Sequence, residues 1–263
     1  MKFLKKIPPI ALFSALLLVL FLLHVAVLSP IIFKVKNDVA YENSYLPFAL
    51  ETILQLVYLA VYVVTFSFIA RSVMRYGAKK SLRFLFAFGG LTLLRYALNI
   101  FCSYMFEGGI PSSSDRILSD VRDGLLQAAF DIFQAVFCFV VTLWLVSNSK
   151  KRYEAALKWA KKHGDESRAE QYNSMKWTSV FDLSNPVQLS LFLSACLIAL
   201  TKVSSRMIYD ISLSEIGVAP TKTDIPLMIA YYAGDLIFGL LIYLGSLTFV
   251  WISEEKAKKK NND

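Results

Sequence analysis

The sequence is poor in charge and in the side chains that build metal centres. Asp, Glu, Lys and Arg make up 18% of its 263 residues, and it has two His and three Cys. His24 has no second His within the same apolar region, and His163 lies in a basic segment. Because a protein metal site needs several ligands that converge, we expect no metal site.

The cysteines do not form a redox or zinc motif. Cys102, Cys138 and Cys196 lie far apart in the chain, each within an apolar stretch, and there is no C-x-x-C pair. Buried free cysteines usually behave as small packing residues. We interpret these three in that way.

Several motifs of catalysis and recognition are also absent. The chain contains no GxxxxGK[ST], GxGxxG, HExxH or GxSxG sequence, so phosphate-loop, dinucleotide, zinc-protease and serine-hydrolase chemistry are not indicated. No basic folded domain of the kind that binds nucleic acid is present. We therefore expect no cofactor and no nucleic-acid partner, and a non-enzyme is favoured over an enzyme.

What the chain does contain is long apolar runs. Hydrophobic residues make up 56% of it, and runs of about 20 apolar residues match the hydrocarbon thickness of a bilayer. Unbroken runs favour helices over the alternating strands of a membrane barrel. The sequence predicts an all-α, polytopic transmembrane bundle that forms a single integral membrane domain over residues 1–263. Its six spans are 8–33, 46–70, 84–106, 124–147, 186–208 and 226–252.

The basic residues predict the orientation of these spans. Most of the 28 Lys and Arg residues lie before the first span, in the connection 71–83, in the connection 148–184 and in the tail 253–263. These segments alternate across the six spans, and Lys and Arg accumulate in cytoplasmic loops. We expect both termini to be cytoplasmic, in a plasma membrane or a bacterial inner membrane. The net charge of +8 then reflects topology, and anionic inner-leaflet lipids are the expected partner.

The loop 148–184 begins with a basic amphipathic stretch. In 150–163, Tyr153, Ala156, Leu157 and Ala160 share one helical face, and lysines cover the rest. Such a stretch either lies on the inner leaflet or continues the fourth helix into solvent.

Local signals mark one helix start and some packing positions. Asn185 followed by Pro186 is typical of an N-cap and a first helical residue. The pairs Ala11/Ala15 and Ala230/Gly234 have the small-xxx-small spacing of close helix contacts.

Three charges lie deep within apolar runs: Arg95, Asp131 and Asp235. Counted from the outer ends at about 1.5 Å per residue, they lie roughly 18, 12 and 16 Å deep. All three therefore fall within about one helical turn of a common level, in the outer half of the bilayer, and Lys202 can reach that level. Ionisable residues inside a membrane face one another or a cavity rather than lipid. We expect Asp131 to lie opposite Arg95 in a polar interior.

Polar residues accompany these charges on single helix faces. Gln127, Asp131 and Gln134 share a face, as do Arg95 and Asn99, because positions three or four apart are neighbours on a helix. Further stripes are Glu51, Gln55, Tyr58 and Tyr62 in the second span and Ser190, Ser194 and Thr201 in the fifth. The predicted substrate-binding residues are Arg95, Asp131, Asp235, Asn99, Gln127 and Glu51.

Short motifs resemble parts of three membrane-protein families without completing any of them. The YD at 209–210 and AGD at 233–235 are similar to the YD and GxGD motifs of intramembrane aspartyl proteases, but Tyr232 replaces the first glycine and no PAL motif follows. The EAA at 154–156 resembles the loop of ABC importer permeases but lacks its glycine. The six-span plan with an AxxxA pair is similar to the substrate-binding subunits of energy-coupling factor transporters. No family is assigned from these matches.

The sequence thus favours a multi-pass membrane protein that binds or transports a small polar or charged solute through a polar site in the outer half of the bundle. Other membrane or ATPase subunits are candidate partners. The alternative is a non-transporting scaffold or assembly partner whose buried ion pairs are structural. A membrane-embedded enzyme is the third interpretation.

Overall fold

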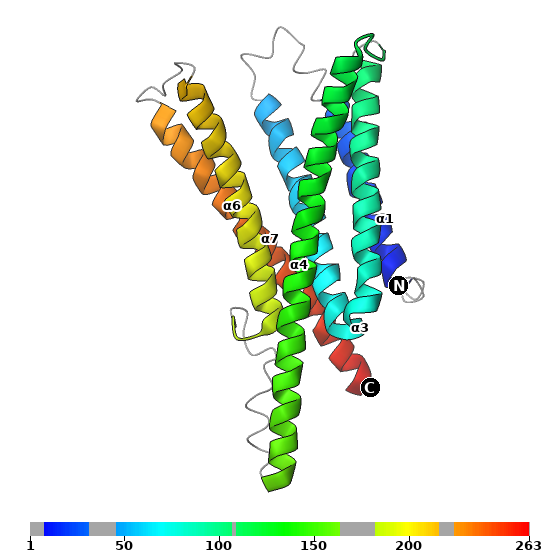
Figure 1. Cartoon of the computed structure of the whole chain (residues 1–263), viewed down its shortest axis with the longest axis vertical. Coiled ribbons are helices and arrows are strands. Elements are labelled where there is room, and N and C mark those ends of the chain that lie inside the picture. The colour runs from blue at the N-terminus through cyan, green and yellow to red at the C-terminus, as the bar shows by residue number, and fades with distance from the viewer. Residues whose placement is uncertain (1–7, 32–45, 107–108, 164–181, 216–223, 263) are drawn as a thin grey trace. The chain divides into compact units, whose positions relative to one another are not determined.

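The computed structural model describes residues 8–31, 46–106, 109–163, 182–215 and 224–262, and all regular secondary structure in these ranges is helical (Figure 1). The elements are α1 (Pro9–Leu22), the π-helical η2 (Leu23–Leu28), α3 (Leu46–Phe106), α4 (Ser114–His163), α6 (Pro186–Glu215) and α7 (Asp224–Asn262). The all-α prediction is confirmed for this part of the chain.

Five helices in the described ranges are long and apolar enough to cross a membrane. They cover Pro9–Ile31, Thr52–Phe106, Ser114–His163, Pro186–Ile208 and Met228–Glu255. Their length and hydropathy indicate an integral membrane protein. Two of the predicted spans, 46–70 and 84–106, lie in the single element α3.

The chain reverses direction within α3, at Gly77. The Ser72 and Ser81 hydroxyl oxygens lie 2.9 Å apart, whereas nine residues of straight helix would separate them by about 13 Å. Gly77 has a φ of 71° and a ψ of −172°, a region that side-chain-bearing residues avoid. α3 therefore consists of a first arm (46–76) and a second arm (78–106) that run antiparallel (Figure 1).

Contacts divide the chain into two compact units, residues 1–139 and 140–263, with the boundary inside α4. In the first unit, α1 packs against both arms of α3. The Phe13 ring lies 5.3 Å from the Phe68 ring and 5.4 Å from the Phe84 ring. Leu17 follows one turn later and is fully buried. Because lipid tails are as apolar as these side chains, close packing rather than removal from water stabilises the contact.

In the second unit, α6 and α7 approach each other at Gly239. A Cβ atom built there would lie 2.7 Å from the Ala199 Cβ and 3.1 Å from the Ala195 carbonyl oxygen. The predicted small-residue pairs are not at such contacts, because Ala11, Ala15, Ala230 and Gly234 are all exposed in the structure. The helix contact thus uses small residues, but not those that the spacing indicated.

The predicted start of α6 is confirmed. The Asn185 Oδ1 accepts hydrogen bonds from the backbone N–H groups of Val187, at 2.9 Å, and Gln188, at 3.3 Å. The following Pro186 has no N–H to satisfy, so the first turn is capped. One turn further, Thr142 of α4 donates to the Ser190 hydroxyl at 3.0 Å.

The basic stretch 150–163 is a helical continuation of α4, and its location in solvent or on the inner leaflet stays a prediction. α4 is helical without interruption from Ser114 to His163. On the predicted apolar face Ala160 is fully buried, while Trp159 is 45% exposed and stacks on His163 at 4.4 Å.

Candidate functional site

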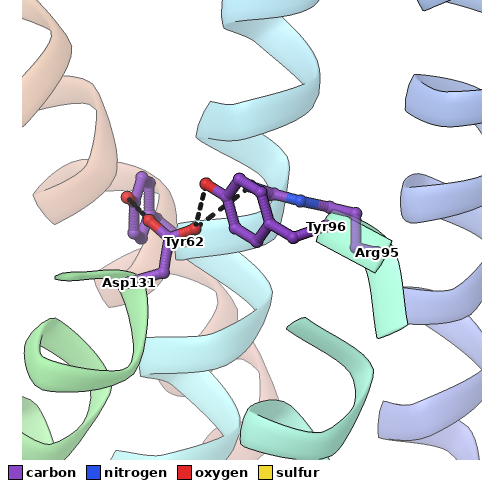
Figure 2. A network of polar contacts seen from close by, with 4 residues as sticks. All are labelled: Tyr62, Arg95, Tyr96 and Asp131. Atoms are coloured by element: carbon purple, nitrogen blue, oxygen red, sulfur yellow. Dashed lines mark hydrogen bonds and ion pairs between the residues drawn. The ribbon is translucent and has the colours of Figure 1, made fainter. Parts of the chain in front are cut away.

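Three hydrogen-bond donors converge on the Asp131 carboxylate in the first unit (Figure 2). Tyr62 of the first α3 arm donates to Oδ1 at 2.8 Å. From the second arm, the Tyr96 hydroxyl and the Arg95 Nη2 donate to Oδ2 at 3.1 and 3.2 Å. Asp131 itself comes from α4, so the cluster joins both arms of α3 to α4.

The predicted pairing of Asp131 with Arg95 is present, and it is buried. The side chains of Arg95 and Asp131 are 2% and 15% exposed, respectively. At such burial, removal of either partner leaves the other charge buried and uncompensated, which typically destabilises a protein by about 3–5 kcal/mol. The pair therefore holds α3 against α4 whatever else it does.

Aromatic rings enclose the Arg95 guanidinium. Its central carbon lies 5.2 Å from the ring centroids of Phe21 and Tyr58 and 4.2 Å from that of Tyr96. The negative faces of aromatic rings attract a cation, by about 2 kcal/mol when the pair is desolvated. These rings replace part of the hydration that Arg95 would have in water.

Some buried polar atoms around this cluster have no hydrogen-bond partner in the described part of the chain. They are the Arg95 Nε, the His24 Nδ1 and the Thr92 Oγ1. His24 belongs to η2, and its ring lies 5.3 Å from the Tyr58 ring. A π-helical turn inside a helix is often found at functional sites.

The other three residues predicted for this site are Asn99, Gln127 and Glu51, and the structure shows no side-chain hydrogen bond between Asp131 and those of the three whose side chains it describes. Asn99 lies one turn beyond Arg95, but its Oδ1 accepts from the Ser29 hydroxyl at 3.1 Å. Gln127, one turn before Asp131, is exposed. Glu51 lies in the first α3 arm, and its side chain is outside the described residues. Of the predicted set, the structure brings Arg95 and Asp131 into direct contact.

A second ionic cluster surrounds Asp235 in the other unit. The Arg206 Nε donates to Oδ2 at 2.8 Å, and the Lys202 Nζ lies 3.9 Å from Oδ1. Lys202 also lies over the Phe238 ring at 4.3 Å, and Arg206 over the Tyr231 ring at 4.8 Å. The cations of α6 therefore neutralise Asp235 of α7. The predicted single layer that joins Asp235 to Arg95 and Asp131 stays a prediction.

Sequence reasoning missed two polar contacts of these clusters. Tyr96 follows Arg95 directly, and adjacent residues do not face each other on a helix, yet both long side chains reach Asp131. Arg206 lies within the predicted span 186–208, but it was not identified as a partner of Asp235. Its spacing of four residues from Lys202 places both cations on one face, and this signal could have revealed it.

Among the residues that the structure describes, no group of three or more His, Cys, Asp or Glu side chains could hold a metal ion. Comparisons with protein-family models, curated proteins and solved structures found no match to this chain.

Proposed function

We propose that this multi-pass membrane protein binds a small polar or charged solute at the Arg95–Asp131 centre and carries it across the bilayer. The supporting observation is that the ion pair is incompletely satisfied. Within the described ranges, Asp131 receives one guanidinium hydrogen bond, from Nη2, while the buried Nε has no hydrogen-bond partner there. A buried donor without a partner destabilises the fold by about 1–3 kcal/mol, and a ligand that satisfied it would remove that penalty.

The predicted residues take definite roles in this proposal. Arg95 holds an anionic group of the solute or balances its charge. Asp131 and Asp235 bind a cation, a proton or an amine. Asn99, Gln127 and Glu51 line the path.

The proposal includes a topology. The two arms of α3 each cross the bilayer, so that six segments cross in total and both termini lie in the cytoplasm. The membrane is a plasma or bacterial inner membrane, anionic lipids contact the inner basic segments, and further membrane or ATPase subunits are candidate partners. The concentration of Lys and Arg in alternate connections supports this arrangement.

A binding measurement tests the function. Purified protein is heated with a panel of metabolites that includes anions, cations, zwitterions and neutral polar solutes, and the unfolding temperature is recorded. We expect at least one chemical class to raise it in the wild type. The matched control is the Arg95→Leu/Asp131→Leu double variant, because apolar replacement of a whole buried ion pair is often neutral for folding. Its unfolding temperature should not respond to that class.

Uptake into proteoliposomes provides the second readout. Asp131→Asn and Asp235→Asn should abolish uptake of the same solute while folded protein remains in the membrane. A wild type that responds to no class of solute and takes up none would overturn the proposal.

The second candidate function is a non-transporting scaffold or assembly partner. The observation that favours it is the near-complete burial of Arg95, whose side chain is 2% exposed and surrounded by three rings. Under this function the double Leu variant keeps its partners and its stability, and no solute binds.

A further inference from the structure

The arrangement around Asp131 has the chemistry of a carboxylate-binding site that is already filled. Two hydroxyls and a guanidinium, from Tyr62, Tyr96 and Arg95, donate to both oxygens of one carboxylate (Figure 2). We call these three residues the carboxylate cradle. All of them belong to α3, whereas the carboxylate belongs to α4.

Asp131 uses this cradle incompletely. The Nε–H and one Nη2–H of a guanidinium point in parallel, and a carboxylate that meets them squarely accepts both. Asp131 accepts from Nη2 at 3.2 Å, and the adjacent Nε has no hydrogen-bond partner among the described residues. Asp131 is tied to the backbone of α4, but a free carboxylate is not, so a free carboxylate can engage both nitrogens.

An independent observation points to the same place. His24 is only 7% exposed, and its Nδ1 has no hydrogen-bond partner in the part of the chain that the structure describes. The His24 ring and the Arg95 guanidinium lie 5.3 and 5.2 Å from the same Tyr58 ring. Native proteins rarely leave such atoms unsatisfied, and each exception requires an explanation. A ligand atom that lies beside Arg95 and accepts or donates these hydrogen bonds would explain both unsatisfied atoms.

From this geometry we infer that the solute is a small organic carboxylate, and that Asp131 occupies its site as an internal substitute until the solute displaces it. This inference depends on the proposed function, because it names the solute class for the Arg95–Asp131 centre. When the solute carboxylate takes the cradle, Asp131 turns away from Arg95. Its side chain is 15% exposed, compared with 2% for Arg95, so it is the partner with room to move.

The experiment uses formate, acetate and propionate as probes, with chloride and neutral acetamide as comparison solutes. Binding to the full chain in detergent is followed by thermal unfolding and by titration calorimetry. Asp131→Asn removes the competing charge but keeps an acceptor for the tyrosines. We expect it to bind acetate at least about tenfold more tightly than the wild type, and acetate to raise its unfolding temperature more.

Two Tyr→Phe comparisons keep the test valid even where Asp131→Asn folds poorly. Tyr62→Phe and Tyr96→Phe each remove one cradle donor and should weaken acetate binding about fivefold or more. Tyr104→Phe is the matched control, since Tyr104 donates to Asp120 at 2.8 Å between the same two helices but outside the cradle. It should leave acetate binding unchanged. Asp123→Asn, in an exposed pair with Arg122, is the matching charge control on α4.

The outcomes separate this inference from the proposed function. If acetate binds only when the cradle is intact, both are supported. If solutes of another class bind in an Arg95-dependent way and carboxylates do not, the carboxylate inference is overturned and the proposed function stands. Acetate binding that is equal in all variants, or absent in Asp131→Asn protein that is folded, also overturns the inference. No binding by any solute overturns both.

Discussion

At the scale of single residues, the Asp131 carboxylate is the side chain that connects the polar groups of the first unit. It compensates the buried charge of Arg95 and accepts from two tyrosines of different α3 arms. A charge in the apolar interior of a membrane protein is tolerated only with such compensation. The stability of the unit should therefore depend on the pair more than on either residue alone.

A double-mutant cycle tests this dependence. Asp131→Leu leaves the Arg95 guanidinium without its counter-charge, so we expect a loss of about 3 kcal/mol in the free energy of unfolding. Adding Arg95→Leu removes the stranded charge and should restore most of that loss. Denaturant titration in detergent measures both. If the two single losses simply add in the double variant, the pair is not coupled as the structure indicates.

At the scale of helices, glycines decide where elements approach and where they turn. Gly239 allows α7 to lie against Ala195 and Ala199 of α6. A Cβ atom at this position would be too close to the Ala199 Cβ and the Ala195 carbonyl oxygen. Gly77 allows α3 to reverse. Both roles follow from the missing Cβ, but the first concerns space and the second concerns backbone conformation.

Gly239→Ala should destabilise the second unit by about 1–3 kcal/mol, because the added Cβ clashes with the Ala199 Cβ and the Ala195 carbonyl. Gly234→Ala on the same helix is the control, since nothing lies within 4 Å of its added Cβ. Thermal unfolding of the two variants provides the comparison. Equal effects would mean that Gly239 is not a close helix contact.

Gly77→Ala should also destabilise the protein, by roughly 1–3 kcal/mol, through backbone strain rather than a clash, because nothing lies within 4 Å of the added Cβ. Gly90→Ala, in the second arm and equally open, has no such strain and should be neutral or slightly stabilising. The same unfolding measurement compares them. A neutral Gly77→Ala would contradict the turn conformation.

At the scale of the whole molecule, the reversal of α3 decides how many times the chain crosses the membrane. The five apolar helices include one of 55 residues, Thr52–Phe106, which folds back at Gly77. The proposed topology, in which both arms cross, assigns the turn to the cytoplasmic side, and it assigns the basic connection 148–184 to that side as well.

Cysteine labelling tests this topology. With the native cysteines replaced by alanine, a membrane-impermeant maleimide should label Ser113→Cys on intact cells, because the proposed topology places the start of α4 outside. Lys79→Cys, beside the turn, and Lys158→Cys, near the end of α4, should react only after permeabilisation. All three positions are exposed in the structure, so a lack of labelling would not be due to burial. External labelling of Lys79→Cys would rule out a cytoplasmic turn, and labelling of Lys79→Cys and Ser113→Cys from the same side would rule out a crossing by the second arm of α3.

Much of the helix content could be predicted from the sequence because it depends on local patterns. Apolar runs of bilayer length and the Asn185–Pro186 cap are local, and both appear in the structure. The small-residue contact was placed wrongly, because many positions share the same spacing and only the facing helix selects one of them. Arg206 was missed because the sequence does not show which face of α6 meets Asp235 of α7.

The sequence by itself determined that the chain is helical and apolar enough for a membrane, and that Arg95, Asp131 and Asp235 each need a partner there, since hydropathy and the penalty for burying charge are properties of residue types. Only the tertiary structure decided which partners they have. It paired Arg95 with Asp131 and Asp235 with Arg206, and it added Tyr62, Tyr96 and the aromatic rings around the guanidinium. Those choices depend on which helix faces meet, and the packing of side chains far apart in the chain sets them.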